Sequence, residues 1–191
     1  MSPTLEPIWH KIEQAVADNA AGGAVALIWH RGETLLHRAT GWAVREPESE
    51  RTPMTPDTIF DLASLTKVVA TTPAVLQLVA ANRIGLDDPI ATYIPEFGSE
   101  GQKRDITIRN LLSHSSGICS WRGVYTTGTG IDAYIASLAA DQPEAAPNSR
   151  VAYSCMGFIL LGEVVRRVSG QRLDDYARDH IFQPLGMTTT M

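Results

Sequence analysis

The sequence feature that most constrains the fold is the segment from Phe60 to Lys67, which leads into a long apolar run. The run predicts a buried helix that begins at Ser64 and continues to about Asn82, with a kink at Pro73. On such a helix Lys67 lies one turn after Ser64, so the two side chains share a face. Any fold of this chain must therefore place a serine hydroxyl beside a lysine amine at the start of a helix.

This pair of residues is suited to nucleophilic catalysis. A serine hydroxyl is a weak nucleophile until a neighbouring base activates it. A lysine in a dry pocket, with its pKa lowered by desolvation, can help to take the proton, and backbone N–H groups at a helix start stabilise an oxyanion. A capping serine followed by a solvated lysine gives the same pattern, because Ser-x-x-Lys arises by chance about once in a chain of this length. Other segments of the sequence must decide between a catalytic serine–lysine pair and a capping serine followed by a solvated lysine.

Composition limits the class of protein. The chain has 191 residues, enough for one core or for two small lobes, and its 44% hydrophobic and 19% charged residues are typical of a globular protein. A net charge of −5, without a basic stripe, disfavours a nucleic-acid partner. No unbroken apolar run reaches the roughly 18 residues of a membrane span. The N-terminus lacks a basic start and an apolar segment, so we expect a cytoplasmic protein with no membrane partner.

The hydrophobic pattern predicts a sheet part followed by a helical part. A helix is expected at Pro7–Asn19, then a hairpin of Ala24–His30, buried on both faces, and residues 34–39. A polar loop at 45–56 and a brief strand at 59–61 follow. Further helices are predicted at residues 86–93 (capped by an aspartate), 107–112, 131–140, 156–169 and 173–180. Residues 1–62 are thus assigned to a sheet domain and residues 63–191 to a helical lobe, with the site between them.

Three aromatic residues are further site candidates. Tyr153 precedes an apolar helix, and a phenol near a lysine can relay a proton, although a packed tyrosine with a bonded hydroxyl fits the same position. Trp121 and Tyr125 lie in the Gly/Ser/Thr-rich segment 113–130, where they could form the walls of a substrate pocket or cover the core.

Several blocks together resemble the serine β-lactamase-like hydrolases, namely class C β-lactamases, D-alanyl-D-alanine carboxypeptidases and related serine esterases. Ser-x-x-Lys is itself a signature of such enzymes. The blocks occur in family order from about residue 20 to the end of the chain. They are Phe60–Lys67, Leu76–Val79 running into Ile84–Pro89, Leu111–Ile118, Tyr153–Gly162 and Pro184–Met187.

The resemblance implies an α/β (α+β) fold of the β-lactamase/transpeptidase type, with an antiparallel sheet portion and a helical lobe. It implies that Ser64 is acylated, that Lys67 tunes the hydroxyl and shuttles its proton, and that Tyr153 serves as general base and then general acid. The Ser64 backbone N–H would be part of the oxyanion hole. No cofactor is implied.

The chain departs from the family pattern at Cys155, where Tyr-x-Asn is usual. That asparagine normally binds the substrate's acylamide group, and a thiol is a weak donor and a weak acceptor. We therefore expect small carboxylic esters as substrates. A β-lactamase or D-Ala-D-Ala peptidase is the first alternative, and a non-catalytic binding module that has kept the fold is the second.

A second departure is that the sequence stops directly after Pro184–Met187. Family members continue with a strand bearing a Lys- or His-containing motif and with closing strands, and the resemblance leads us to expect that this sequence lacks them. The strand supplies the second oxyanion donor, whose loss costs about two to three orders of magnitude in rate. We expect a fragment of a longer protein, or a form completed by self-association or by a partner.

Other signals are weaker. His114 could join a Ser-His-Asp arrangement, but no Gly-x-Ser-x-Gly elbow occurs in the sequence, and a histidine anchoring a loop is the favoured interpretation. The five histidines show no metal-ligand spacing. Cys119 and Cys155 are expected to be reduced and free. The Gly-x-Gly-x-x-Ala match at 128–133 is interpreted as a turn into a helix.

Overall fold

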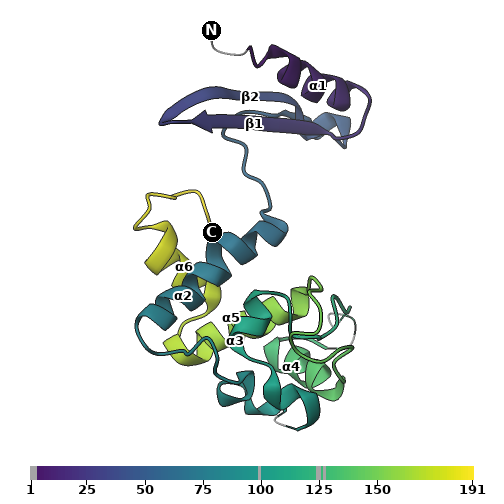
Figure 1. The fold of residues 1–191 in the computed structure, drawn as a ribbon. Coiled ribbons are helices and arrows are strands. Elements are labelled where there is room, and N and C mark those ends of the chain that lie inside the picture. Colours follow the sequence, from purple (N-terminus) through teal and green to yellow (C-terminus); the bar gives the residue numbers. More distant parts are fainter. Residues whose placement is uncertain (1–3, 99, 124–125, 127) are drawn as a thin grey trace. The chain divides into compact units, whose positions relative to one another are not determined.

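The computed structural model describes residues 4–98, 100–123, 126 and 128–191. The chain divides into two compact units, Met1–Asp61 and Leu62–Met191, beside the boundary expected from the sequence. The first unit contains a helix and a three-stranded sheet, and the second unit is built from helices and short helical turns (Figure 1).

The first unit is an antiparallel sheet with one helix packed on it. Its strands are ordered β1-β2-β3. Gly23 pairs with Gly41 where the chain approaches itself closely: a Cβ at Gly41, whose φ is +79°, would lie 2.6 Å from the carbonyl oxygen of Gly22. Only glycine fits at that position. The elements of this unit are α1 (Glu6–Ala17), β1 (Gly23–His30), β2 (Glu33–Val44), a 3-10 turn (Glu48–Glu50) and β3 (Thr52–Pro53).

Burial in this sheet differs from the expectation for β1. Trp9 of α1 and Leu36 of β2 are buried, whereas Leu27 and Trp29 of β1 are 58% and 64% exposed. The expectation of a strand buried on both faces was therefore wrong. A continuous apolar run indicates a strand but does not show which of its faces is covered.

The segment that follows the hairpin also differs in two places. The expected loop at 45–56 contains the short strand β3, which pairs with the end of β2. The strand expected at Ile59–Asp61 does not form, and this stretch is irregular with Phe60 half exposed. A run of three residues is too short for its pattern to specify a strand without a pairing partner.

The second unit has its core around α5. Leu160, Leu161, Val164 and Val165 of this helix are completely buried, and burial of each such side chain stabilises the fold by about 1.5–3 kcal/mol. The helices are α2 (Thr72–Ala80), α3 (Ile108–Leu112), α4 (Ile131–Ala140), α5 (Cys155–Ser169) and α6 (Leu173–Ala177); shorter 3-10 turns lie at Ala63–Leu65, Ile90–Thr92, Pro95–Phe97 and Gly101–Asp105, and π turns at Lys67–Thr71 and Arg178–Phe182.

The helix expected from Ser64 to Asn82 forms, but not as one regular α-helix. It starts as a 3-10 turn at Ala63, passes through the π turn Lys67–Thr71 and continues as α2. The N–H of Thr72 bonds to the carbonyl of Lys67, five residues back. Pro73 lies in the first turn of α2, where a missing N–H costs little. The π turn, which has a wider backbone than an α-helix, ends shortly before this proline.

Two later helices also differ from the prediction. The stretch expected to be a helix at 86–93 is a loop followed by the 3-10 turn Ile90–Thr92, and Asp88 does not cap it. The Asp88 carboxylate instead accepts hydrogen bonds from the Gly85 N–H and the Tyr93 hydroxyl, at 2.8 Å and 2.5 Å. The helix expected at 173–180 ends as α6 at Ala177 and passes into a π turn.

One described helical stretch, Ala63–Ala80, is long and apolar enough to cross a membrane by length and composition, with a mean hydropathy of 1.3. This stretch contains threonines and one lysine, so it is not one of the continuous apolar runs that the sequence analysis considered. The finding is weak evidence, because the core helix of a soluble protein passes the same test.

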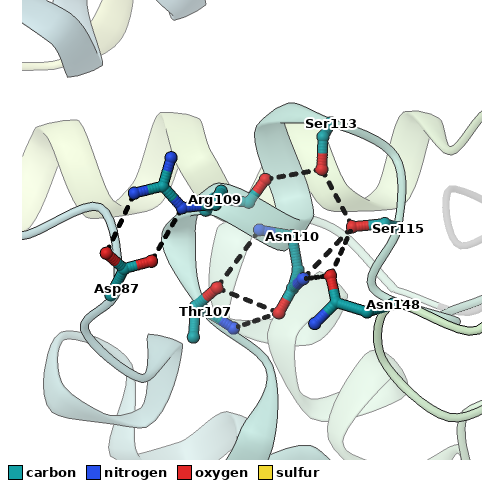
Figure 2. A network of polar contacts seen from close by, with 7 residues as sticks. All are labelled: Asp87, Thr107, Arg109, Asn110, Ser113, Ser115 and Asn148. Atoms are coloured by element: carbon teal, nitrogen blue, oxygen red, sulfur yellow. Dashed lines mark hydrogen bonds and ion pairs between the residues drawn. The ribbon is translucent and has the colours of Figure 1, made fainter.

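A polar network ties α3 to the loops around it (Figure 2). Thr107 and Asn110 form a capping box, in which each side chain binds the backbone N–H of the other residue. The side-chain amide of buried Asn110 also donates to Ser115 Oγ at 3.1 Å and to Asn148 Oδ1 at 2.7 Å. One buried amide therefore joins the start of α3, the turn after it and the loop before α5.

Replacing Asn110 should destabilise the protein markedly. Asn110→Ala removes the cap and leaves several buried partners unsatisfied, which should lower the free energy of unfolding by about 2–4 kcal/mol. The matched control is Arg109→Ala, which removes the exposed ion pair with Asp87 in the same helix and should change stability much less. Urea denaturation of both variants tests this expectation, and equal losses would contradict it.

Candidate active site

Ser64 stands in the first turn of the helical stretch Ala63–Ala80. The turn Ala63–Leu65 is a 3-10 turn, and the Ser64 side chain is exposed. Ala63 has a φ of +44°, in the left-handed region that favours glycine. A residue with a Cβ is strained in this conformation, so the backbone is strained directly before Ser64.

Lys67 and Tyr153 converge on the Ser64 hydroxyl. Lys67 Nζ lies 3.3 Å from Ser64 Oγ and Tyr153 Oη lies 2.7 Å from the same oxygen. The Lys67 ammonium is also 5.0 Å from the centre of the Tyr153 ring. The structure thus brings the hydroxyl, the amine and the phenol together within the second unit.

Cys155 completes this cluster. Lys67 Nζ is 3.5 Å from Cys155 Sγ, and the thiol is 3.9 Å from Tyr153 Oη. Both residues are placed by Ser154, the N-cap of α5, whose hydroxyl accepts from the Gly157 N–H and donates to the Cys119 carbonyl. The Cys155 N–H bonds to the carbonyl of Ser120 at 2.8 Å. Cys155 therefore stands at the first position of α5 with its side chain beside the lysine.

The pKa of Lys67 is not lowered as the sequence analysis expected. Partial burial does lower this pKa, but the hydrogen bond with Tyr153 and the attraction and hydrogen bond of Cys155 raise it more, so the pKa ends above the ordinary value of 10.5. Ser64 is exposed and Tyr153 is 50% exposed, so the surroundings are not dry enough for desolvation to dominate. Lys67 is therefore an ammonium group at neutral pH.

A cleft of about 560 Å³ adjoins Lys67 and Cys155. Its charged residues include two ion pairs, Arg166 with Glu163 and Arg172 with Asp174, at 2.6 Å and 3.0 Å. Its volume lies in the range of small-molecule sites. The apolar part of its lining comes mainly from α4, α5 and α6, and consists of Ile131, Phe158, Ile159, Gly162 and Leu173.

Of the two aromatic candidates from the 113–130 segment, the described one, Trp121, is not part of this arrangement. Trp121 is 61% exposed and is not among the described residues that line the cleft. Tyr125 lies outside the described residues. Among the residues that the structure describes, no group of three or more His, Cys, Asp or Glu side chains is placed to hold a metal ion.

His114 lies beside the cluster, and the sequence analysis favoured a structural role for it. The His114 ring packs against Tyr153 and Phe158, with centroid distances of 4.7 Å and 5.1 Å, and its Nδ1 accepts from the Ser154 N–H. A Ser-His-Asp arrangement requires a bond between the histidine ring and a serine hydroxyl, whereas Nδ1 of His114 bonds to a backbone N–H. In the sequence, the signal that pointed to His114 was its position in the block Leu111–Ile118, which carries part of the family resemblance.

Comparison with known proteins identifies the family. The sequence profile of the family described as Beta-lactamase matches residues 10–191. The chain belongs to the Beta-lactamase family. It is 35% identical over 193 residues to esterase EstB of Burkholderia gladioli, covering 92% of this chain and 48% of that protein. It is also 35% identical over 164 residues to penicillin-binding protein 4 of Amycolatopsis lactamdurans, covering 82% and 39%.

The fold is that of the same family. The octameric penicillin-binding protein homologue from Pyrococcus abyssi superposes with a TM-score of 0.83 at 27% identity, covering 97% of this chain and 44% of that one. The expected β-lactamase/transpeptidase-like fold is confirmed. The chain spans about half the length, or less, of the relatives that it matches. The family consists of hydrolytic serine enzymes, among them esterases, β-lactamases and penicillin-binding proteins.

The raised pKa of Lys67 should depend on the phenol. In Tyr153→Phe the hydroxyl bond is lost while partial burial remains, so the pKa of Lys67 should fall from its raised value toward or below 10.5. NMR titration of the lysine side chain measures this change. Tyr93→Phe is the control, because the Tyr93 hydroxyl bonds to Asp88. A Lys67 pKa unchanged by Tyr153→Phe would refute the assignment.

Proposed function

We propose that this protein is a serine hydrolase that forms an acyl-enzyme on Ser64. The observation that carries the proposal is the placement of Tyr153 Oη and Lys67 Nζ at 2.7 Å and 3.3 Å from Ser64 Oγ. Both distances are within reach of direct proton transfer or of charge stabilisation.

The reaction begins with attack of Ser64 Oγ on the substrate's carbonyl carbon. Tyr153 reacts as the phenolate, so the hydroxyl proton passes to Tyr153 Oη and gives the neutral phenol, while the Lys67 ammonium stabilises the negative charge that develops on Ser64 Oγ. The N–H of Ser64, at the start of the helix, is one donor to the carbonyl oxygen as it becomes an oxyanion. Tyr153 then returns the proton to the departing alcohol, which leaves Ser64 acylated.

The acyl-enzyme is hydrolysed by the reverse use of the same groups. A water molecule donates its proton to Tyr153 Oη as it attacks the acyl carbon, and the Ser64 oxygen recovers a proton when the carboxylic acid leaves. Half exposure of Tyr153 is consistent with access of water to this position.

We propose small carboxylic esters as the substrates. Cys155 lies where family members usually carry an asparagine that binds an acylamide group, and a thiol makes that contact poorly. The cleft beside Lys67 is walled by apolar side chains, and its pairs Arg166–Glu163 and Arg172–Asp174 already satisfy each other. These features suit an uncharged ester with an apolar chain. The 35% identical relative EstB is itself an esterase.

A β-lactamase or D-Ala-D-Ala peptidase is the second candidate, favoured by the equal identity to penicillin-binding protein 4. Hydrolysis of nitrocefin and of a short p-nitrophenyl ester separates the two. Turnover of the ester at a much higher kcat/KM supports the esterase proposal, and the reverse order supports the alternative. A binding module without turnover would hydrolyse neither compound.

Ser64→Ala should abolish activity. With the nucleophile removed, kcat for p-nitrophenyl acetate should fall by at least about 10³-fold, and a fluorophosphonate probe should no longer label the chain. Ser149→Ala is the control, since that hydroxyl is exposed and donates to the Ala146 carbonyl. Mass spectrometry of the labelled protein locates the modified residue. Labelling elsewhere, or unchanged hydrolysis by Ser64→Ala, would rule out the proposed nucleophile.

The cleft should make turnover depend on the length of the apolar chain. Each buried CH₂ contributes about 0.8 kcal/mol, so kcat/KM should rise about threefold to fourfold per methylene until the cleft is filled. Ile159→Trp narrows the cleft and should lower the ratio of octanoate to acetate hydrolysis. Leu185→Trp alters an exposed apolar residue outside the cleft lining and should leave that ratio unchanged. A flat chain-length profile would contradict this use of the cleft.

A further inference from the structure

His114 binds the backbone on both sides of Tyr153. Its carbonyl accepts from the Ala152 N–H at 2.8 Å, and its ring Nδ1 accepts from the Ser154 N–H at 3.1 Å. The residue before the phenol and the residue after it are therefore both held by one histidine. A shift of His114 would move the backbone that carries Tyr153.

The His114 ring also contacts the phenol directly. Its centroid is 4.7 Å from that of Tyr153, with the planes tilted by 42°, and 5.1 Å from that of Phe158 in α5. Aromatic pairs at this separation and tilt attract each other and limit the rotation of each ring. The Tyr153 hydroxyl therefore has a restricted direction, in which it reaches Ser64 Oγ.

The polar network of α3 includes Ser113 and Ser115, the residues on either side of His114 (Figure 2). The φ of His114 is +57°, a left-handed conformation that occurs in tight turns. The next residue, Ser115, donates its N–H to the Asn110 carbonyl and accepts from the Asn148 N–H, each at 2.8 Å. The turn that carries His114 is thus fixed to α3 and to the loop that precedes Tyr153.

We propose that His114, in its neutral form, is a positioning residue that aims the Tyr153 hydroxyl at Ser64. This role rests on the proposed function, because it matters only if Tyr153 moves a proton at Ser64. The ring touches neither the Ser64 oxygen nor the cleft, so it acts through Tyr153.

The bond from the Ser154 N–H requires an unprotonated Nδ1. In the imidazolium form both ring nitrogens are donors, so Nδ1 and the Ser154 N–H would repel each other. Partial burial and the positive charge of Lys67 both lower the pKa of His114 below its ordinary value of 6.5. Tyr153 is the titratable residue packed against the ring, and the neighbour from α5 is the uncharged Phe158.

The sign of the pH dependence follows. Above pH 6.5 the ring is neutral and the bond to Ser154 is intact. As the pH falls through the lowered pKa, the ring takes up a proton, the bond breaks and activity declines. Folding stability declines in the same direction below pH 6.5, because the unfolded chain binds this proton more readily than the folded chain does.

Two variants test the role in the full chain. His114→Ala removes the acceptor and the ring, and should lower kcat for p-nitrophenyl acetate by about 10- to 100-fold with little change in KM. In His114→Asn the side-chain oxygen can take the place of Nδ1, and asparagine adopts left-handed backbone readily. His114→Asn should therefore recover most of the lost kcat. The decline of kcat at low pH that we assign to His114 (the acid limb) should disappear in this variant, because asparagine does not take up a proton. Thermal denaturation of each variant shows whether it is folded under assay conditions.

NMR of the histidine ring nitrogens in the wild-type protein supplies a readout independent of turnover. We expect His114 to carry its proton on Nε2 and to titrate below 6.5. A proton on Nδ1, or a midpoint at or above 6.5, would overturn the proposal. So would a folded His114→Ala with wild-type kcat, or a His114→Asn that keeps the acid limb.

Failure of the proposed function gives a different result. If the wild-type protein hydrolyses neither p-nitrophenyl esters nor nitrocefin while His114 has the expected tautomer and midpoint, the serine hydrolase proposal fails and the histidine contact is only structural. If esters are hydrolysed and both variants behave like wild type, the positioning role alone fails.

Discussion

The geometry of the site depends on the backbone at Ser154. Its hydroxyl begins α5 by binding the Gly157 N–H, and the same hydroxyl holds the Cys119 carbonyl. Because α5 contributes four completely buried side chains to the core of the second unit, the position of Ser154 is set by core packing. Tyr153 and Cys155 flank this cap directly. A rigid hydrophobic helix thus determines where a phenol and a thiol stand relative to the Ser64 hydroxyl.

The charge at the centre of the cluster has a clear origin. Lys67 has a phenol, a thiol and a serine hydroxyl as neighbours, and the phenol and the thiol raise its pKa, which favours the ammonium form over the neutral amine. A fixed positive charge beside the attacking oxygen stabilises a transition state in which negative charge develops. In the proposed reaction, this arrangement gives the lysine the role of electrostatic stabilisation and leaves Tyr153 as the group that carries the proton.

Sequence reasoning could reach part of this site. The pairing of Ser64 with Lys67 follows from the helical repeat, whereas Tyr153 is distant in sequence and was connected to them only through resemblance to a family. The direction of the Lys67 pKa was wrong, because a sequence shows that a lysine is near an apolar helix but not which groups bond to it. The contacts of His114 depend on a left-handed turn fixed by Asn110, and no local pattern specifies such a turn.

In the fold, long periodic segments were the most predictable. The helix at 131–140 forms with the expected bounds, and α5 starts within one residue of them, since each has a regular apolar face. Short segments such as Ile59–Asp61 were not predictable, because their state depends on whether a partner strand lies beside them. The exposure of Leu27 and Trp29 shows the same limit, because covering a face is a property of the whole assembly of elements.

The left-handed backbone at Ala63 has a consequence for how this chain can change. A residue with a β-carbon in that conformation carries about 1–3 kcal/mol of strain, held in place by the structure around it. Glycine would release that energy and make the fold more robust, but it would also let the serine that follows sample more directions. Selection for heat tolerance and selection for rapid turnover would thus favour different residues at position 63, directly before the proposed nucleophile.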